Sequence, residues 1–120
     1  MGARYEELEV WRRSVELSVA IYRESESIRD YGFRDQLTRV ALSVPSNISE
    51  GYERDSPAEI IQFLKVAKGS ACEMRTQLII GEKAAFLPES KAQQWADEAQ
   101  QLGRMLGALL NHHKKMQAHV

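Results

Sequence analysis

Apolar residues recur every three or four positions along most of this 120-residue chain, which is the period of an amphipathic α-helix. The first such segment covers about residues 5–27 and carries two adjacent stripes. One stripe contains Leu8, Trp11, Val15, Ser18 and Tyr22, and the other contains Val10, Ser14, Leu17, Ile21 and Ile28. Two stripes fit either one wide core face, or one face for the core and one for another subunit.

The second segment begins near Phe33, after a short link in which Asp30 is a candidate N-cap. Its apolar stripe keeps the same phase before and after Pro45. Proline inside a helix costs about 3 kcal/mol, because it lacks an N–H and clashes with the carbonyl four residues earlier. The unchanged phase favours one continuous helix that is kinked at Pro45. The alternative is a new helix capped by Asn47, with Glu50 completing a capping box.

The third segment has a clear start, with Ser56 as N-cap, Pro57 in the first position and Glu59 in the third. It runs to about residue 85. Gly69 lies inside it, and we expect a neighbouring helix to approach closely there. The fourth segment starts near Pro88 and extends to about residue 112. It carries one apolar stripe with alternating steps of three and four (Ala92, Trp95, Ala99, Leu102, Leu106 and Leu109) and a second stripe of mostly small residues (Ala96, Gly103, Gly107 and Leu110).

No segment alternates with the period of a β-strand, and the links between the four segments are short. Short links place consecutive helices antiparallel to one another. The sequence therefore predicts an all-α fold, an antiparallel up-down-up-down four-helix bundle. We expect a single domain over residues 1–120, with about 113–120 as a frayed tail.

Composition narrows the class of protein. Hydrophobic residues make up 43% and charged residues 28%, which is typical of a globular domain, and the net charge of −1 is unusual for a protein that binds nucleic acid through its phosphates. A single cysteine excludes an internal disulfide. No apolar run reaches the length of a membrane span, and the amino terminus lacks a signal-peptide core. We expect a cytoplasmic protein that does not enter a membrane.

Candidate catalytic or metal-binding residues are scarce. No Glu-x-x-His pair occurs, and all three histidines (His112, His113 and His119) lie in the last nine residues. Cys72 has no histidine near it in sequence and is interpreted as a partly buried structural thiol. The sequence therefore predicts no enzyme, no metal and no cofactor.

Two groups of polar residues are candidate sites. The first is a polar network between helices or subunits, for which the alternative is simple exposure to solvent. Its residues are Ser43, Asn47, Glu50, Lys68, Glu73 and Gln77. The second is a basic surface for RNA or DNA, for which the alternative is a solvated surface of mixed charge, because acidic residues are interleaved with it. Its residues are Arg12, Arg13, Arg34, Arg39, Arg54 and Lys65.

Two stretches carry a family resemblance: "VWRRSVELSVAIY", and "LTRVALSVPSNISEGYERDSPAEIIQFLKVAKGSACEMRTQL". The sequence resembles the four-helix-bundle family encoded by intervening sequences of bacterial large-subunit (23S) ribosomal RNA genes, which is related to the accessory protein of diversity-generating retroelements. The resemblance covers about residues 8–87. The family's SVPSN motif matches residues 43–47, and Glu50 and Gly51 match its downstream pair; both are taken as structural positions only.

The resemblance implies a cytoplasmic bundle that assembles as a homopentamer and has no known catalytic residues. In the retroelement branch the pentamer is basic, binds nucleic acid and partners the reverse transcriptase, whereas this chain is slightly acidic. We therefore expect a non-catalytic, homo-oligomeric scaffold or interaction module of uncharacterised cellular role. The alternative is an accessory protein that binds RNA or DNA, and an enzyme with a novel site ranks last.

Overall fold

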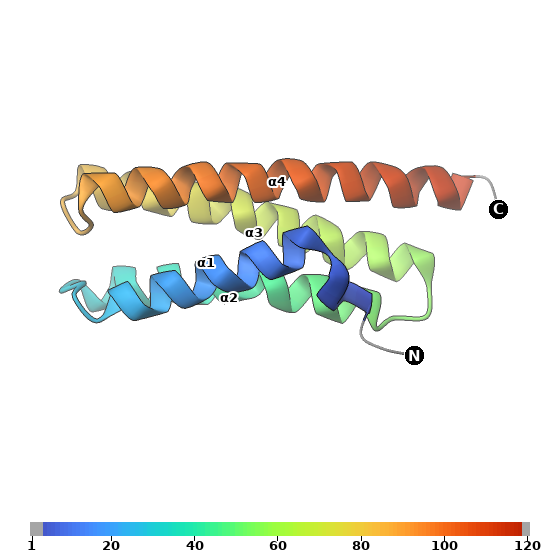
Figure 1. The fold of residues 1–120 in the computed structure, drawn as a ribbon, viewed down its shortest axis with the longest axis horizontal. Coiled ribbons are helices and arrows are strands. Elements are labelled where there is room, and N and C mark those ends of the chain that lie inside the picture. Colours follow the sequence, from blue (N-terminus) through green and yellow to red (C-terminus); the bar gives the residue numbers. More distant parts are fainter. Residues whose placement is uncertain (1–3, 119–120) are drawn as a thin grey trace.

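The computed structural model of the chain describes residues 4–118, which form an elongated bundle of 50 × 24 × 21 Å. A short 3₁₀ helix, η1 (Arg4–Glu7), precedes four α-helices: α1 (Glu9–Ser25), α2 (Tyr31–Tyr52), α3 (Pro57–Lys83) and α4 (Glu89–Ala118). Consecutive helices run in opposite directions (Figure 1). No β-strand occurs among the described residues. The predicted all-α four-helix bundle is confirmed.

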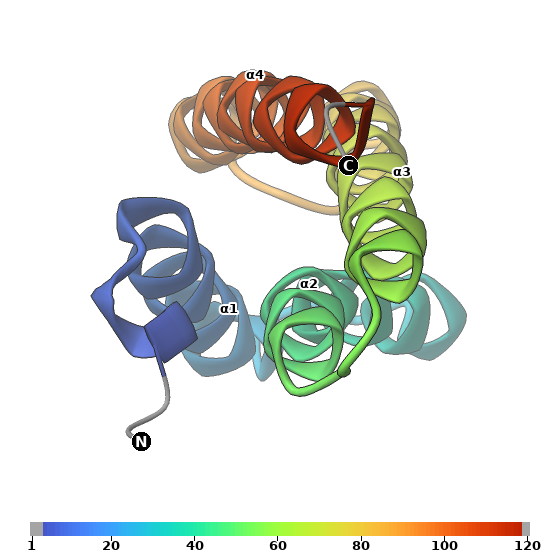
Figure 2. The same ribbon diagram turned by 90° about the vertical axis from the view of Figure 1, so that its right-hand side faces the viewer.

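The helices are arranged in sequence order around the bundle (Figure 2). Each packs on the helix before it, and the ring is completed where α4 meets α1, which is the weakest of the four helix–helix contacts. Among the described residues, the backbones of the diagonal pairs, α1 with α3 and α2 with α4, do not approach one another closely, although the side chain of Tyr52 at the end of α2 reaches His113 of α4. The bundle is therefore held mainly by α2, α3 and α4, with α1 resting chiefly on α2.

The core resolves which of the two stripes of the first segment faces inward. Val10, Leu17 and Ile21 of α1 are buried, together with the small side chain of Ser14. On the other stripe, Ser18 is buried, Leu8, Trp11 and Val15 are half-buried, and Tyr22 is 44% exposed. Larger side chains of the other three helices fill the centre. They include Leu37, Val44 and Ile48 of α2, Leu64, Met74 and Leu78 of α3, and Leu102 and Leu106 of α4.

Local signals set most helix starts. The Asp30 side chain accepts a hydrogen bond from the backbone N–H of Phe33 at 2.9 Å, so α2 begins two residues earlier than predicted. The Ser56 hydroxyl accepts from the N–H of Glu59, and Pro57 is the first residue of α3, as predicted. Each side chain replaces a partner that the first turn of a helix lacks.

Three predicted helix ends are wrong. The first helix begins at Glu9, because Leu8 is extended and separates it from η1. The third ends at Lys83, because Ala85 adopts a positive φ of 62° and the N–H of Phe86 bonds back to the carbonyl of Gly81. This is the Schellman ending of a helix. The fourth continues to Ala118, so residues 113–118 are helical rather than a frayed tail, while His119 and Val120 lie outside the described residues.

The second helix is continuous through Pro45, and the alternative of a new helix capped by Asn47 is wrong. Pro45 has no N–H to donate to the carbonyl of Ala41, four residues earlier. The Ser18 hydroxyl of α1 lies 2.8 Å from that carbonyl and 2.9 Å from the Ser14 carbonyl of its own helix, so it donates its single hydrogen between these two acceptors, and both contacts are buried. A side chain from the neighbouring helix therefore satisfies the carbonyl that the proline leaves unpaired. A bend of the helix axis at Pro45 stays a prediction.

Gly69 does not mark a close approach of another helix, which corrects the sequence-based expectation. A Cβ atom built on Gly69 would meet no atom within 4 Å. The tight position on α3 is Gly81, where an added Cβ would lie 2.5 Å from Cζ of Phe33. Gly69 is instead exposed on the side of α3 that adjoins α4.

Candidate interaction surfaces

A polar seam runs between α2 and α3. The hydroxyls of Ser43 and Ser70 lie 2.8 Å apart, and the Asn47 amide donates to the Ser43 carbonyl at 2.7 Å and to its hydroxyl at 3.0 Å. Further along the seam, the Gln77 amide donates to the Glu73 carboxylate at 3.3 Å. The Gln77 side-chain oxygen is buried without a hydrogen-bond partner. An open groove of about 400 Å³ lies over this seam.

The seam contains four of the six residues predicted for a polar network: Ser43, Asn47, Glu73 and Gln77. Glu50 lies away from it, on the exposed side of α2, where it pairs with Arg54 at 2.5 Å. Lys68 lies on the other side of α3, in the groove with α4. The structure also adds Ser70, which sequence reasoning missed. Its signal was the spacing of seven residues from Ser70 to Gln77, which puts both on one face of a helix.

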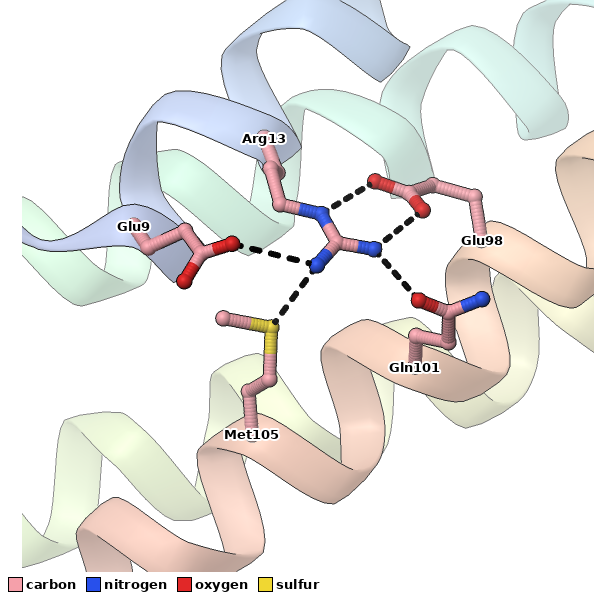
Figure 3. A network of polar contacts seen from close by, with 5 residues as sticks. All are labelled: Glu9, Arg13, Glu98, Gln101 and Met105. Atoms are coloured by element: carbon pink, nitrogen blue, oxygen red, sulfur yellow. Dashed lines mark hydrogen bonds and ion pairs between the residues drawn. The ribbon is translucent and has the colours of Figure 1, made fainter.

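Arg13 joins α1 to α4, the least tightly packed of the four pairs of neighbouring helices. Figure 3 shows its polar contacts. Its guanidinium donates two hydrogen bonds to the Glu98 carboxylate, at 2.9 and 2.6 Å, and a third to the Gln101 side chain at 2.6 Å. Glu9 lies 3.4 Å away on the same helix. The hydrogen bonds and charge of Glu98 raise the pKa of Arg13 above its ordinary value. The positive charge of Arg13 is therefore matched within the chain.

The structure does not bring together the six residues predicted for a basic surface. Arg12 donates to the backbone carbonyls of Glu6 and Glu7 and fixes the end of η1. Arg34 lies over the ring of Tyr31, and Arg54 over that of Phe63 as well as beside Glu50. Arg39 borders the polar seam, and Lys65 lines the groove between α3 and α4. These side chains are spread over several sides of the bundle.

Positive charge gathers instead in the groove between α3 and α4, which has a volume of about 670 Å³. Five basic residues line it: Lys65, Lys68 and Arg75 from α3, and Arg104 and Lys114 from α4. No aspartate or glutamate lines it. Cys72 also lines this groove and is exposed, so the expectation of a partly buried thiol is wrong.

An aromatic contact joins the carboxyl-terminal part of α4 to the end of α2. The hydroxyl of Tyr52 and Nε2 of His113 lie 2.7 Å apart, and the ring of His112 packs on that of His113. Burial raises the pKa of Tyr52. Burial, and next the charge of His112, lower the pKa of His113. Over residues 4–118, no three His, Cys, Asp or Glu side chains lie together in a way that could hold a metal ion.

An apolar surface lies on the outer side of α1 and α2. Val19, Tyr22 and Leu42 are each 44–45% exposed, and Trp11 and Val15 are half-buried beside them on the same stripe of α1. The bond from Ser18 to the Ala41 carbonyl shows that this side of α1 adjoins α2. Val66 and Ile80 are exposed on α3, at 43% and 51%. None of the described helices is both long and apolar enough to be a membrane-spanning segment.

Comparison with known proteins agrees with this fold. Residues 6–108 match the family described as "23S rRNA-intervening sequence protein". Among solved structures, the chain is similar to a protein of unknown function from the S23 ribosomal protein family of Bacteroides thetaiotaomicron, with a TM-score of 0.79 and 19% identity over 85% of this chain and 95% of the other. No curated protein matches the sequence. Because the family match extends over most of its length, the chain belongs to the 23S rRNA-intervening sequence protein family.

Proposed function

We propose that the chain is a non-catalytic helical module that assembles with copies of itself and serves as a scaffold or interaction platform. The observation that carries the proposal is the apolar surface of α1 and α2, where Val19, Tyr22 and Leu42 remain exposed although the core is complete without them. Apolar side chains grouped on one outer face are typical of a protein interface. The number of five subunits comes from the family resemblance.

The placement of the exposed apolar residues suits a ring. A closed ring with an odd number of subunits needs two different surfaces on each chain, one contacting the preceding copy and one the following copy. The second surface is the outer face of α3, with Val66 and Ile80. α1 and α3 are diagonal in the bundle, so their outer faces point in different directions (Figure 2). Head-to-tail contact between these two faces closes into a ring when the rotation between neighbouring subunits is a whole fraction of a turn.

Light scattering coupled to size exclusion tests the proposal at micromolar protein concentration. The expected mass is that of five 13.7 kDa chains. Leu42→Glu places a charge in the apolar surface and is expected to lower the mass. Ala108→Glu, which adds the same charge at an exposed position of α4, is the matched control and should keep the assembly. A wild-type chain that elutes as a monomer would refute self-assembly.

A second candidate function is the binding of nucleic acid by an accessory protein. The observation that favours it is the unbalanced positive charge of the groove between α3 and α4, which contains Lys65 from the predicted basic surface. Family context makes ribosomal RNA the first substrate to test. A ring would repeat the groove in every subunit and strengthen weak contacts by avidity. Filter binding of RNA and of DNA at low salt is the measurement, and retention of neither would exclude this function.

A further inference from the structure

The groove between α3 and α4 has two chemically different parts. Its floor consists of small and apolar residues, among them Gly69, Ala71, Ala99, Gly103 and Leu110. Its two walls carry the five basic side chains described above. The walls belong to α3 and α4, which pack on one another more extensively than any other pair, so the backbone on both sides of the groove is held in place.

The positive charges of this groove have no ion-pair partner among residues 4–118. Across residues 4–118, the cations that form ion pairs are Arg13, Arg54 and Lys91, and none of these lines the groove. The chain as a whole is slightly acidic, so this gathering of unpaired cations is not a consequence of its composition. Cations that are gathered in one groove without carboxylates favour an anionic occupant.

The floor distinguishes between anionic occupants. Bases of single-stranded nucleic acid stack on aromatic side chains, and no aromatic residue lines this groove. Phosphate groups bind cations at the walls and gain nothing from an apolar floor. An amphipathic helix with acidic flanks uses both parts, because its apolar side chains enter the floor while its carboxylates reach the walls.

The dimensions suit a helix as well. A Cβ atom built on Gly69 or on Gly103 would meet no atom within 4 Å, so a guest backbone has room to approach both positions. At Gly107 the added Cβ would lie 3.5 Å from Cε of Lys68. The aliphatic part of the Lys68 side chain therefore extends from α3 across the groove to α4. The lining residues extend from Lys65 to Arg75 on α3 and from Ala99 to Lys114 on α4, which is about 15 and 22 Å of helix. A guest of about three to four turns matches that length.

We propose that the groove between α3 and α4 binds an acidic amphipathic helix of a partner protein. The partner helix presents a row of small or aliphatic side chains to the floor and glutamate or aspartate residues to both walls. The proposed subunit contacts use α1, α2 and the face of α3 that carries Val66 and Ile80. None of the residues named for those contacts lines the groove, so the two proposals are tested at different residues.

Fluorescence anisotropy with the full chain and a labelled designed peptide is the test. The probe is a helix of about 14 residues, or about 21 Å, with a Leu/Ala stripe flanked by glutamates. In the control peptide every glutamate is lysine. We expect the acidic peptide to bind at micromolar concentration in low salt and the basic peptide not to bind. Failure of the acidic peptide to bind, or equal binding of both peptides, would overturn the proposal.

Three variants locate the binding and separate a helix from a phosphate ligand. The double change Lys65→Gln/Arg104→Gln removes one cation from each wall and should weaken peptide binding about tenfold, because two exposed ion pairs are lost. The same double change at Arg29 and Arg39, outside the groove, should leave it unchanged. Gly103→Leu fills the floor of the groove without altering its charge and should abolish peptide binding. Circular dichroism checks that this variant folds, and Gly103→Ala is a smaller change at the same position.

The decisive contrast uses a labelled RNA duplex measured on the same proteins. If the groove takes a helix, Gly103→Leu weakens peptide binding far more than any RNA binding. If RNA binds, is weakened by Lys65→Gln/Arg104→Gln and is indifferent to Gly103→Leu while the acidic peptide fails to bind, the groove is a phosphate site and the proposal is wrong.

Discussion

The hydroxyl of Ser18 is expected to stabilise the bundle only because Pro45 is present. Ser18 and Ala41 are both buried, with 5% and 1% of their surfaces exposed, and the hydroxyl is the hydrogen-bond donor that replaces the missing N–H of Pro45. Ser18→Ala leaves the Ala41 carbonyl buried without that donor. The expected loss in the free energy of unfolding is about 2 kcal/mol, within the range for an unsatisfied buried polar group.

Replacement of the proline should cancel most of that loss. In Pro45→Ala the new N–H can bond to the Ala41 carbonyl, so adding Ser18→Ala should then cost no more than about 0.5 kcal/mol. Pro45→Ala alone gains about 3 kcal/mol of helix propensity and loses about 1.6 kcal/mol for two buried methylene groups. The single variant should therefore be about as stable as the wild type or slightly more stable.

Urea unfolding followed by circular dichroism, at one pH and one protein concentration, measures all four proteins of this double-mutant cycle. The expected coupling between the two positions is about 1.5 kcal/mol. Ser25→Ala is the matched control: Ser25 is a buried serine of α1 that bonds within its own helix, to the carbonyl of Tyr22 at 2.6 Å. Its effect should be the same with proline or alanine at position 45. Additive costs for Ser18→Ala and Pro45→Ala would refute the reasoning.

Three further measurements probe the packing, the ion pair between α1 and α4, and the pH response. Gly81→Ala should destabilise the fold by more than about 1 kcal/mol, because the added Cβ overpacks against Phe33. Gly69→Ala should stabilise it by up to about 1 kcal/mol, because the added Cβ has open space. Thermal unfolding of both variants measures the two effects. Arg13 and Glu98, both 27% exposed, should show a coupling of about 1 kcal/mol in a double-mutant cycle, and a coupling that ignores high salt would contradict an electrostatic contact. The lowered pKa of His113 means that the unfolded chain binds its proton more readily, so stability is full above the ordinary pKa of 6.5 and falls as the pH drops through the folded value. In urea unfolding measured from pH 7.5 to 5, the free energy of unfolding of His113→Gln should fall less with decreasing pH than that of the wild type. An unchanged pH dependence would show that another group causes the fall.

The start of α3 could be predicted because its chemistry is local. Ser56, Pro57 and Glu59 form a start signal within four residues, and the structure uses it as written. The end of α3 could not, because the left-handed position that closes the helix is Ala85 rather than the usual glycine. An alanine gives no sequence signal for a positive φ. The sequence "KAAF" therefore predicts a continued helix, and the predicted end of α3 lies two residues beyond the observed one.

The polar network was only partly predictable, for a geometric reason. Ser43 and Asn47 are one turn apart and share a side of α2, so their spacing indicated a common neighbour. Lys68 and Gln77 are nine residues apart, which is about 180° around a helix, so they cannot face the same neighbour. Only the bundle's arrangement shows which side of α3 meets α2 and which meets α4. Ser70 belongs to the seam for that reason, and its spacing of seven residues from Gln77 was the only sign of it in the sequence.

The net charge of −1 argued against binding to the phosphates of nucleic acid, and the structure shows why the net charge alone is a poor guide to local charge. The arginines that looked most useful for binding are occupied: Arg13 by Glu98 and Arg54 by Glu50. Acidic residues thus neutralise some of the basic side chains and leave others unpaired. No carboxylate reaches the α3/α4 groove, so its cations face solvent unpaired in a protein whose sum is slightly negative. Attraction between molecules depends on such local fields within about 10 Å, the screening length of dilute salt, rather than on the sum over the whole chain. An acidic partner can therefore be drawn to one side of this bundle while the rest of its surface offers no net attraction.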